Sequence, residues 1–195
     1  ASKIILTIGN FCGGFRDYRE TDNLIFRSGF SAEEVVDFRY RGSGQPGFMT
    51  IKSDDGRIHT HAYPEYVRAT GVMKNFRCKT CIDATAELAD FSFGDAWLKR
   101  FIGTKKPWSI YITRNKDVLH YWEKYLLQTD VEHENITEAE IIRSQLGNIS
   151  SKKYRQEYRK RLYNLIGVDV PNFGNNTGFK NGSLLFELKV MASQF

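Results

Sequence analysis

The sequence predicts a mixed α/β (α+β) fold, a single domain in which helices flank a mixed β-sheet. Its 195 residues are 41% hydrophobic, 26% charged and 14% aromatic, which is typical of a globular domain with a sizeable core. Short apolar runs at residues 3–8, 48–62 and 108–113 alternate with segments of helical periodicity. No internal repeat or low-complexity stretch occurs, which excludes repeat architectures.

The first elements follow from local pattern. Residues 3–8 form a continuous, largely β-branched run, which predicts a buried strand. A helix is expected over residues 18–28, with Leu24 and Ile25 turned inward and Gly29 ending it. A capping-box pattern at residues 31–34 leaves room only for a short turn before the next strand.

The remaining elements are expected from alternation, turn residues and caps. Before the cysteine pair they are a strand at 35–40, a loop at 41–47, a hairpin of 48–53 and 57–62, and a short helix at 65–72. After it they are an irregular stretch at 82–98 with one or two strand pieces, a strand at 108–113, helices at 117–127, 137–146 and 152–166, a loop at 171–182, and a strand or helix at 184–191.

Charge and hydropathy restrict the class of protein. The net charge is +5, with a pI of about 9.1 and a mean hydropathy of −0.45, and the charge is spread along the chain. No apolar run approaches the roughly 18 residues of a membrane span, and the first residues are too short for a signal peptide. We expect a soluble, cytoplasmic protein. Because no Met opens the chain and an apolar run begins at once, we also expect a piece of a longer or split protein.

Three cysteines are the clearest chemical signal. Cys78 and Cys81 form a C-x-x-C pair that can bind one face of a metal or cluster, and Cys12 lies in a glycine-rich loop from which a third thiolate could approach. Zinc would need a fourth ligand, which His59 or His61 could supply. A four-iron cluster usually takes four cysteines, one more than the chain holds. The alternative is three unrelated, partly buried cysteines.

A glycine-rich loop and an acidic stretch are the next candidates. Arg41-Gly-Ser-Gly-Gln-Pro-Gly47 lets backbone N–H groups approach an anion or a flat ring, with Arg41 able to grip a phosphate; a plain turn is the alternative. Asp83, Glu87, Asp90 and Asp95 follow the cysteine pair, where they could orient ligands or bind a hydroxyl, or merely cap turns.

The basic segment 152–166 could touch a phosphate, but a solvated helix face explains it better, so nucleic acid is not expected as a partner. Its basic and aromatic residues are Lys152, Lys153, Tyr154, Arg155, Tyr158, Arg159, Lys160 and Arg161.

Three motifs occur together in a characteristic order: Phe11-Cys12-Gly13-Gly14, the loop 41–47, and the run from Arg77 to Trp97 that ends in Gly-Asp-Ala-Trp. Together they resemble the C-terminal domain of the coenzyme F-420 hydrogenase/dehydrogenase beta-subunit family, over roughly residues 4–170. The segment Glu140-Ile-Ile-Arg-Ser-Gln-Leu-Gly147 also looks like that family.

The resemblance implies an iron–sulfur flavoprotein oxidoreductase, with a [4Fe-4S] cluster and FAD, that passes electrons to an acceptor such as a deazaflavin or another organic substrate. It implies cluster ligation by Cys12, Cys78 and Cys81. The fourth ligand would come from an upstream segment with a Gly-x-Pro-Cys motif, from a partner subunit, or from a group such as Asp83.

The resemblance further implies flavin contacts, at Arg41, Gly42, Gly44, Gln45, Gly47, Asp83, Thr85 and Asp95. Gln45 departs from the aromatic residue expected there, which bears on the flavin or substrate face. Residues 1–170 would form the oxidoreductase domain and 171–195 an extension packed on it. We expect the isolated chain to be inactive and to need a redox partner. The alternative is a zinc-stabilised or non-catalytic interaction domain that kept the fold.

Overall fold

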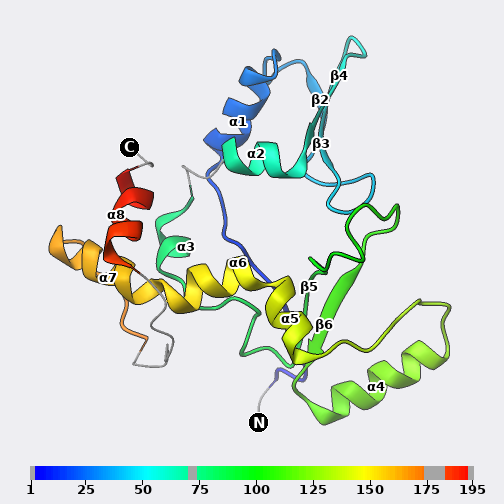
Figure 1. Cartoon of the computed structure of the whole chain (residues 1–195). Coiled ribbons are helices and arrows are strands. Elements are labelled where there is room, and N and C mark those ends of the chain that lie inside the picture. The colour runs from blue at the N-terminus through cyan, green and yellow to red at the C-terminus, as the bar shows by residue number, and fades with distance from the viewer. Residues whose placement is uncertain (1–2, 70–73, 174–182, 193–195) are drawn as a thin grey trace.

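The computed structural model describes residues 3–69, 74–173 and 183–192. Its strands form two separate three-stranded sheets (Figure 1). The first sheet has the order β1-β5-β6, with β1 (Ile8–Asn10) parallel to β5 (Phe91–Asp95) and β5 antiparallel to β6 (Ser109–Thr113). The mixed α/β class is confirmed, and the mixed sheet is accompanied by a second sheet.

The second sheet is an antiparallel meander of β2 (Val35–Arg39), β3 (Phe48–Ser53) and β4 (Ile58–Ala62). In Figure 1, α1 (Tyr18–Arg27) and α2 (Tyr63–Ala69) lie beside this sheet. Strand β3 alternates between its two faces, and the fully buried Met49 and Ile51 lie at its centre. They form one hydrophobic core with Leu24, Ile25, Phe30 and Tyr66.

The other helices follow the second sheet in the sequence. They are α3 (Phe76–Thr80), α4 (Lys116–Leu127), α5 (Glu138–Ser144), α6 (Leu146–Ile149), the π-helix η1 (Ser150–Tyr154), α7 (Gln156–Leu165) and α8 (Leu184–Ala192). A second core of Ala96, Leu98, Phe101 and Ile110 lies at the end of β5 and the start of β6. Glu187 of α8 is fully buried and pairs with Arg155 and Arg159, which fixes α8 on α7.

Most predicted elements are confirmed within one or two residues. The helix at 18–28, the hairpin at 48–62, the strand at 108–113 and the helix at 117–127 all form, and residues 184–191 are helical. The capping box at Thr137 is present, with Glu140 reaching back to the Thr137 N–H. Of the predicted helix 65–72 and loop 171–182, residues 70–73 and 174–182 lie outside the described residues.

The prediction of a buried strand at 3–8 is wrong. The strand begins only at Ile8, and Ile4 and Ile5 are 69% and 95% exposed. The ladder to β5 starts at Ile8, and Thr7 is held instead by Asp90, whose carboxylate accepts hydrogen bonds from the Thr7 N–H and hydroxyl. The apolar run therefore leads into β1, an edge strand of its sheet, although its composition suggested a strand in the buried interior.

The prediction of one regular helix over residues 152–166 is also wrong. The segment starts as the π-helix η1 and continues as α7, and the Arg155 N–H donates to the Ser150 carbonyl five residues back. A π-turn rotates side chains away from the positions that a 3.6-residue period predicts. No helix in the described part of the chain combines the length and apolar character needed to span a bilayer.

A pair of histidines lies in the second sheet. The Nε2 atoms of His59 and His61 lie 2.9 Å apart, and Ser28 Oγ lies 3.3 Å from the Nε2 of His61. Burial, and next the neighbouring His59, lower the pKa of His61 below its usual 6.5, against a smaller opposing effect of Glu65.

We therefore predict that the contribution of His61 to the free energy of unfolding is fully present above about pH 6.5. It declines as the pH falls from there through the lowered pKa of folded His61, because the unfolded chain binds the proton more readily than the folded one. Urea unfolding between about pH 7.5 and 5.5 measures this decline. His61→Gln should flatten it, and the exposed His133→Gln should not. An unchanged slope in His61→Gln would contradict the prediction.

Candidate functional site

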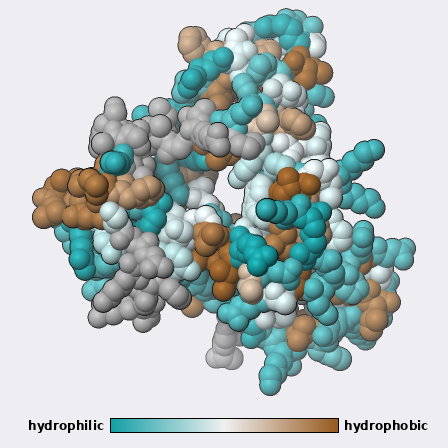
Figure 2. Space-filling view, viewed as in Figure 1, coloured by the Kyte–Doolittle hydropathy of each residue, from teal (hydrophilic) through white to brown (hydrophobic). Residues whose placement is uncertain are grey.

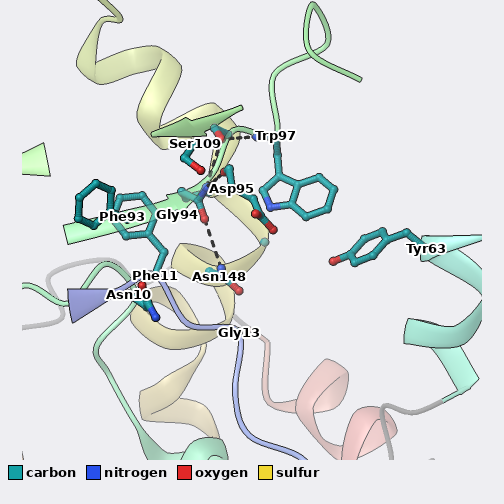
Figure 3. A pocket seen from close by; sticks show the side chains of 13 residues that line it. Asn10, Phe11, Gly13, Tyr63, Phe93, Gly94, Asp95, Trp97, Ser109 and Asn148 are labelled. Atoms are coloured by element: carbon teal, nitrogen blue, oxygen red, sulfur yellow. Dashed lines mark hydrogen bonds between the residues drawn. The ribbon is translucent and has the colours of Figure 1, made fainter. Parts of the chain in front are cut away.

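A cavity of about 600 Å³ lies where the two sheets approach one another, in the region of the central hollow of Figure 2. This size is typical of small-molecule and cofactor sites. Four parts of the chain line it: the segment after β1, the start of α2, the facing ends of β5 and β6, and the α5–α6 junction. The lining residues are Asn10, Phe11, Gly13, Tyr63, Phe93, Gly94, Asp95, Trp97, Ser109, Ser144, Gln145, Gly147 and Asn148 (Figure 3).

Gly94 lets the segment after β1 run along one side of the cavity. A Cβ at Gly94 would stand 2.0 Å from the ring of Phe11, so only glycine lets that ring lie against β5. The Phe11 N–H donates to the Phe93 carbonyl at 2.6 Å, and the next N–H, of Cys12, donates to the Ala84 carbonyl at 3.2 Å. Phe11 and Gly13 therefore line the cavity, while the Cys12 backbone is tied to the turn that follows Cys81.

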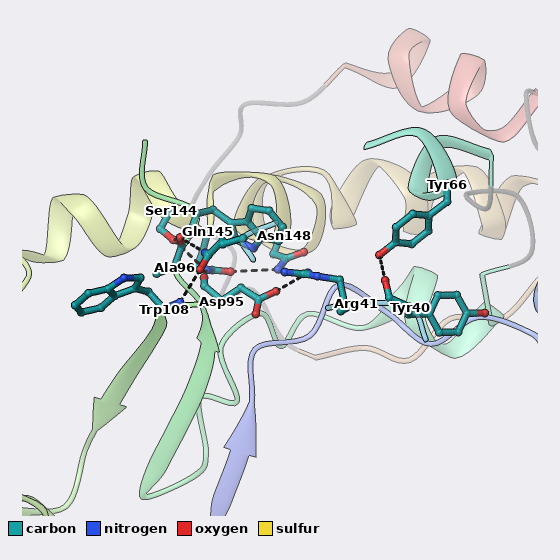
Figure 4. A network of polar contacts seen from close by, with 11 residues as sticks. Tyr40, Arg41, Tyr66, Asp95, Ala96, Trp108, Ser144, Gln145 and Asn148 are labelled. Atoms are coloured by element: carbon teal, nitrogen blue, oxygen red, sulfur yellow. Dashed lines mark hydrogen bonds and ion pairs between the residues drawn. The ribbon is translucent and has the colours of Figure 1, made fainter. Parts of the chain in front are cut away.

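Two buried glutamines hold the end of β5. The Gln145 side chain donates to the Asp95 carbonyl at 2.7 Å (Figure 4). The Gln45 side chain donates to the Ala96 carbonyl and accepts from the Trp108 N–H at 2.6 Å. Since both ends of its amide are used and it is only 3% exposed, Gln45 does not face the cavity, contrary to its expected place at a flavin or substrate face.

Arg41 lies at the edge of the cavity. Its Nη1 is 2.9 Å from Asp95 Oδ2, and its guanidinium carbon lies 4.8 Å and 5.1 Å from the ring centroids of Tyr63 and Trp97. Its Nε is buried and has no hydrogen-bond partner among the described residues. Burial raises the pKa of Tyr63 above its usual 10, so its hydroxyl, which points toward Trp97 and Asp95 in Figure 3, stays protonated at neutral pH.

The glycines of the loop serve its shape. Gly42, Gly44 and Gly47 have φ values of 153°, 97° and 80°. A Cβ at Gly47 would stand 2.2 Å from the Gly42 carbonyl oxygen, and one at Gly44 would stand 2.8 Å from that of Thr104. None of residues 42–47 lines the cavity, and the loop directly follows Arg41 at its edge.

The predicted acidic contacts divide into two groups. Asp95 lines the cavity beside Arg41. Asp83 instead accepts the Glu87 N–H at 3.1 Å, and Thr85 accepts from Arg114 at 3.4 Å, so both shape the turn after the cysteine pair.

All three cysteines are free thiols. Cys78 accepts a hydrogen bond from the Phe15 N–H at 3.1 Å, and Cys81 lies 3.7 Å from the Asp83 carbonyl oxygen. Among the described residues, no three His, Cys, Asp or Glu side chains are grouped to hold a single metal ion. His59 and His61 contact each other and Ser28 in the second sheet, so the expectation that one completes a zinc site has no support in this arrangement.

Two lysines face the thiols. Lys74 donates to the Gly13 carbonyl; its pKa is lowered first by burial and next by Lys152 and Arg159, while Cys78 and Cys12 act in the opposite direction. Lys152 is 3% exposed, and its ammonium donates to the Asp83 carbonyl at 2.5 Å and lies 3.7 Å from Cys81 Sγ. The thiols therefore lie in an electropositive part of the structure.

Sequence reasoning missed several cavity residues, above all Tyr63, Ser144, Gln145 and Asn148. The segment 140–147 resembles the family, but the resemblance does not indicate a chemical role for it. The adjacent Ser144 and Gln145 near the end of the predicted helix are the signal that could have suggested a polar role. Tyr63 carries no local signal, because it reaches the cavity only through the packing of α2.

Comparison with known proteins agrees with this architecture. The family model for the C terminus of the coenzyme F420 hydrogenase/dehydrogenase beta subunit matches residues 1–139, so the chain belongs to this family of oxidoreductase subunits. The chain is also similar to a solved chain of the F420-reducing [NiFe] hydrogenase complex from Methanosarcina barkeri, with a TM-score of 0.56 and 18% identity. The match covers 88% of this chain and 55% of that one, so the chain spans about half the length of that relative. No curated protein matches the sequence significantly.

We predict that Gln45→Ala destabilises the fold by about 2–4 kcal/mol, since the Ala96 carbonyl and the Trp108 N–H each lose a buried partner. Urea unfolding gives the value, with the exposed Gln128→Ala as the control expected within about 0.5 kcal/mol of the parent. A loss below about 1 kcal/mol would show that water replaces the amide without cost.

Proposed function

We propose that this chain is the C-terminal part of an iron–sulfur flavoprotein oxidoreductase, which passes electrons between a [4Fe-4S] cluster, FAD and an acceptor such as a deazaflavin or another organic substrate. One observation carries the proposal: Cys12 lies between two residues that line the cavity, and its backbone is bonded to the turn after Cys81. A thiolate-bound centre and a cavity-bound cofactor would therefore be neighbours.

The cavity fits a flavin in size and chemistry. Phe11, Tyr63 and Trp97 offer aromatic surface, and Arg41 has an unused buried Nε donor at the edge. Arg41 and Asp95 would hold the cofactor, and Asn148, which also lines the cavity (Figure 3), would offer a further polar contact. Asp83, Thr85 and the 42–47 loop would act through the turn and through Arg41.

The thiol region fits an iron–sulfur cluster better than a single ion. A cluster separates its ligands more widely than one metal ion does, and the donors are thiols supported by an N–H donor and by lysines. Cys12, Cys78 and Cys81 would supply three ligands. An upstream segment, a partner subunit or Asp83 would supply the fourth.

Bound together, the two cofactors would supply the electron-transfer chemistry. The chain's own residues would position and tune them. Arg41 would place positive charge at the cavity edge, the neutral Tyr63 hydroxyl would donate a hydrogen bond there, and the buried glutamines would keep the end of β5 fixed.

We further propose that residues 1–170 act as the oxidoreductase domain, with 171–195 packed on it, and that the chain is inactive by itself. An upstream segment or a partner subunit would complete both cofactor sites. A redox partner would deliver or accept the electrons.

The test is an anaerobic preparation of the full-length protein and of this chain, each assayed for iron, acid-labile sulfide, flavin and reduction by dithionite. We expect about four iron atoms and one flavin in the full-length protein and fewer of both in the chain alone. Zinc near one atom per chain, with neither flavin nor sulfide, would replace the proposal by a zinc-stabilised interaction domain.

Arg41→Ala in the full-length protein should weaken flavin binding roughly tenfold, which corresponds to the loss of one charge-assisted hydrogen bond. Flavin released on ultrafiltration at graded concentrations measures it. Arg39→Ala is the matched control, because Arg39 is exposed and its ion pair within the described structure is with Asp37. Equal flavin retention in both variants would remove Arg41 from the site.

A further inference from the structure

The strongest unexplained feature outside the cavity is a pair of lysines near the cysteines, of which Lys152 is buried and Lys74 is half-buried. Lys152 has one of the least exposed charged side chains in the described chain, and its ammonium contacts the Asp83 carbonyl and Cys81 Sγ. Among the described residues, neither Lys74 nor Lys152 has a carboxylate within ion-pair distance. The Lys152 ammonium is therefore turned toward a thiol and a carbonyl, and the Lys74 ammonium toward the carbonyl of Gly13, the residue after Cys12.

Of two neighbouring lysines, only Lys152 reaches the thiol region. Lys152 and Lys153 are neighbours in η1, yet Lys153 pairs with Glu87 while Lys152 is buried against Cys81 and Asp83. The division falls within a π-helical turn, and such irregularities concentrate at functional sites. Lys152 therefore departs from the solvated face that the sequence predicts for the basic segment.

The cost of burying the Lys152 ammonium favours an anion beside it. A buried ammonium without a negative partner is strongly unfavourable, and carbonyl oxygens compensate for it only in part. Arg159 adds a third cation in the same region, although it is balanced by Glu187. The thiol of Cys81 lies 3.7 Å from the Lys152 ammonium, and thiolates bound to a metal centre, as proposed for Cys12, Cys78 and Cys81, carry net negative charge.

We propose that Lys74 and Lys152 are the counter-charges of the thiolate-bound centre, and that they retain it and raise its reduction potential. The inference deepens the proposed function and rests on it. Lys152 would act from the side of Cys81, and Lys74 from the side of the Gly13 carbonyl, between the thiols and the cavity.

The effect on reduction follows from charge. Reduction adds one electron to the centre, supplied by dithionite in the test, and no bond forms or breaks. A fixed positive charge within a few ångströms favours the more negative, reduced state. Removing one such charge should lower the equilibrium constant for reduction roughly tenfold, which is about 59 mV for a one-electron couple.

The experiment compares Lys152→Met, Lys74→Met, Lys152→Arg and Lys153→Met in the full-length protein. Iron and sulfide content are measured after anaerobic reconstitution, and the midpoint potential by redox titration followed in the visible spectrum. Lys153→Met is the matched control. It removes an equal charge from the residue next to Lys152, and Lys153 is paired with Glu87.

We expect a potential more negative by about 59 mV in Lys152→Met and Lys74→Met, and values near the parent in Lys152→Arg and Lys153→Met. If a Met variant takes up no iron while Lys152→Arg does, the charge is needed for retention, which also supports the proposal. Equal shifts in Lys152→Met and Lys153→Met, or no shift in either, would overturn it. A parent protein that binds no cluster would overturn the proposed function and this inference together.

Discussion

Four hydrogen bonds meet at the backbone of residues 95–97, and the cavity depends on them. Gln145 and Gln45 donate to the carbonyls of Asp95 and Ala96, the Trp108 carbonyl accepts from the Ala96 N–H, and Ser144 Oγ accepts from the Trp97 N–H. They join the end of β5 to three other segments, which contribute Gln45, Trp108 and the pair Ser144 and Gln145. Because buried backbone groups are costly to leave unpaired, the three segments cannot separate without exposing the end of β5 to water.

The same strand places the thiol region beside the cavity. Gly94 admits the Phe11 ring against β5, and the chain then carries Cys12 past the cavity to the Ala84 carbonyl. The turn at residues 83–87 is fixed by Asp83 and by Arg114, which contacts Thr85. A short mixed sheet with few ladder bonds thus obtains its precision from side chains that bond to backbone.

The two sheets serve different purposes. The antiparallel sheet buries Met49 and Ile51 in a conventional apolar core, and its contribution to the cavity is made at its border, where Arg41 follows β2 and Tyr63 follows β4. The mixed sheet is smaller and more polar around its end. Each sheet has its own apolar core, cofactor chemistry is proposed at the end of the mixed sheet, and the ion pair of Arg41 with Asp95 joins the two.

The sequence by itself determined the fold class, the hairpin at 48–62, most helix limits and the three cysteines, because turn residues, caps and periodicity act over a few neighbouring residues. The tertiary structure decided the rest. It left Ile4 and Ile5 exposed, buried Gln45, broke the helix at 152–166, and turned Lys152 toward Cys81. These outcomes depend on contacts between residues about 50 to 85 positions apart, such as Gln45 with Ala96, Lys152 with Cys81 and Thr7 with Asp90, and local pattern carries no information about such contacts.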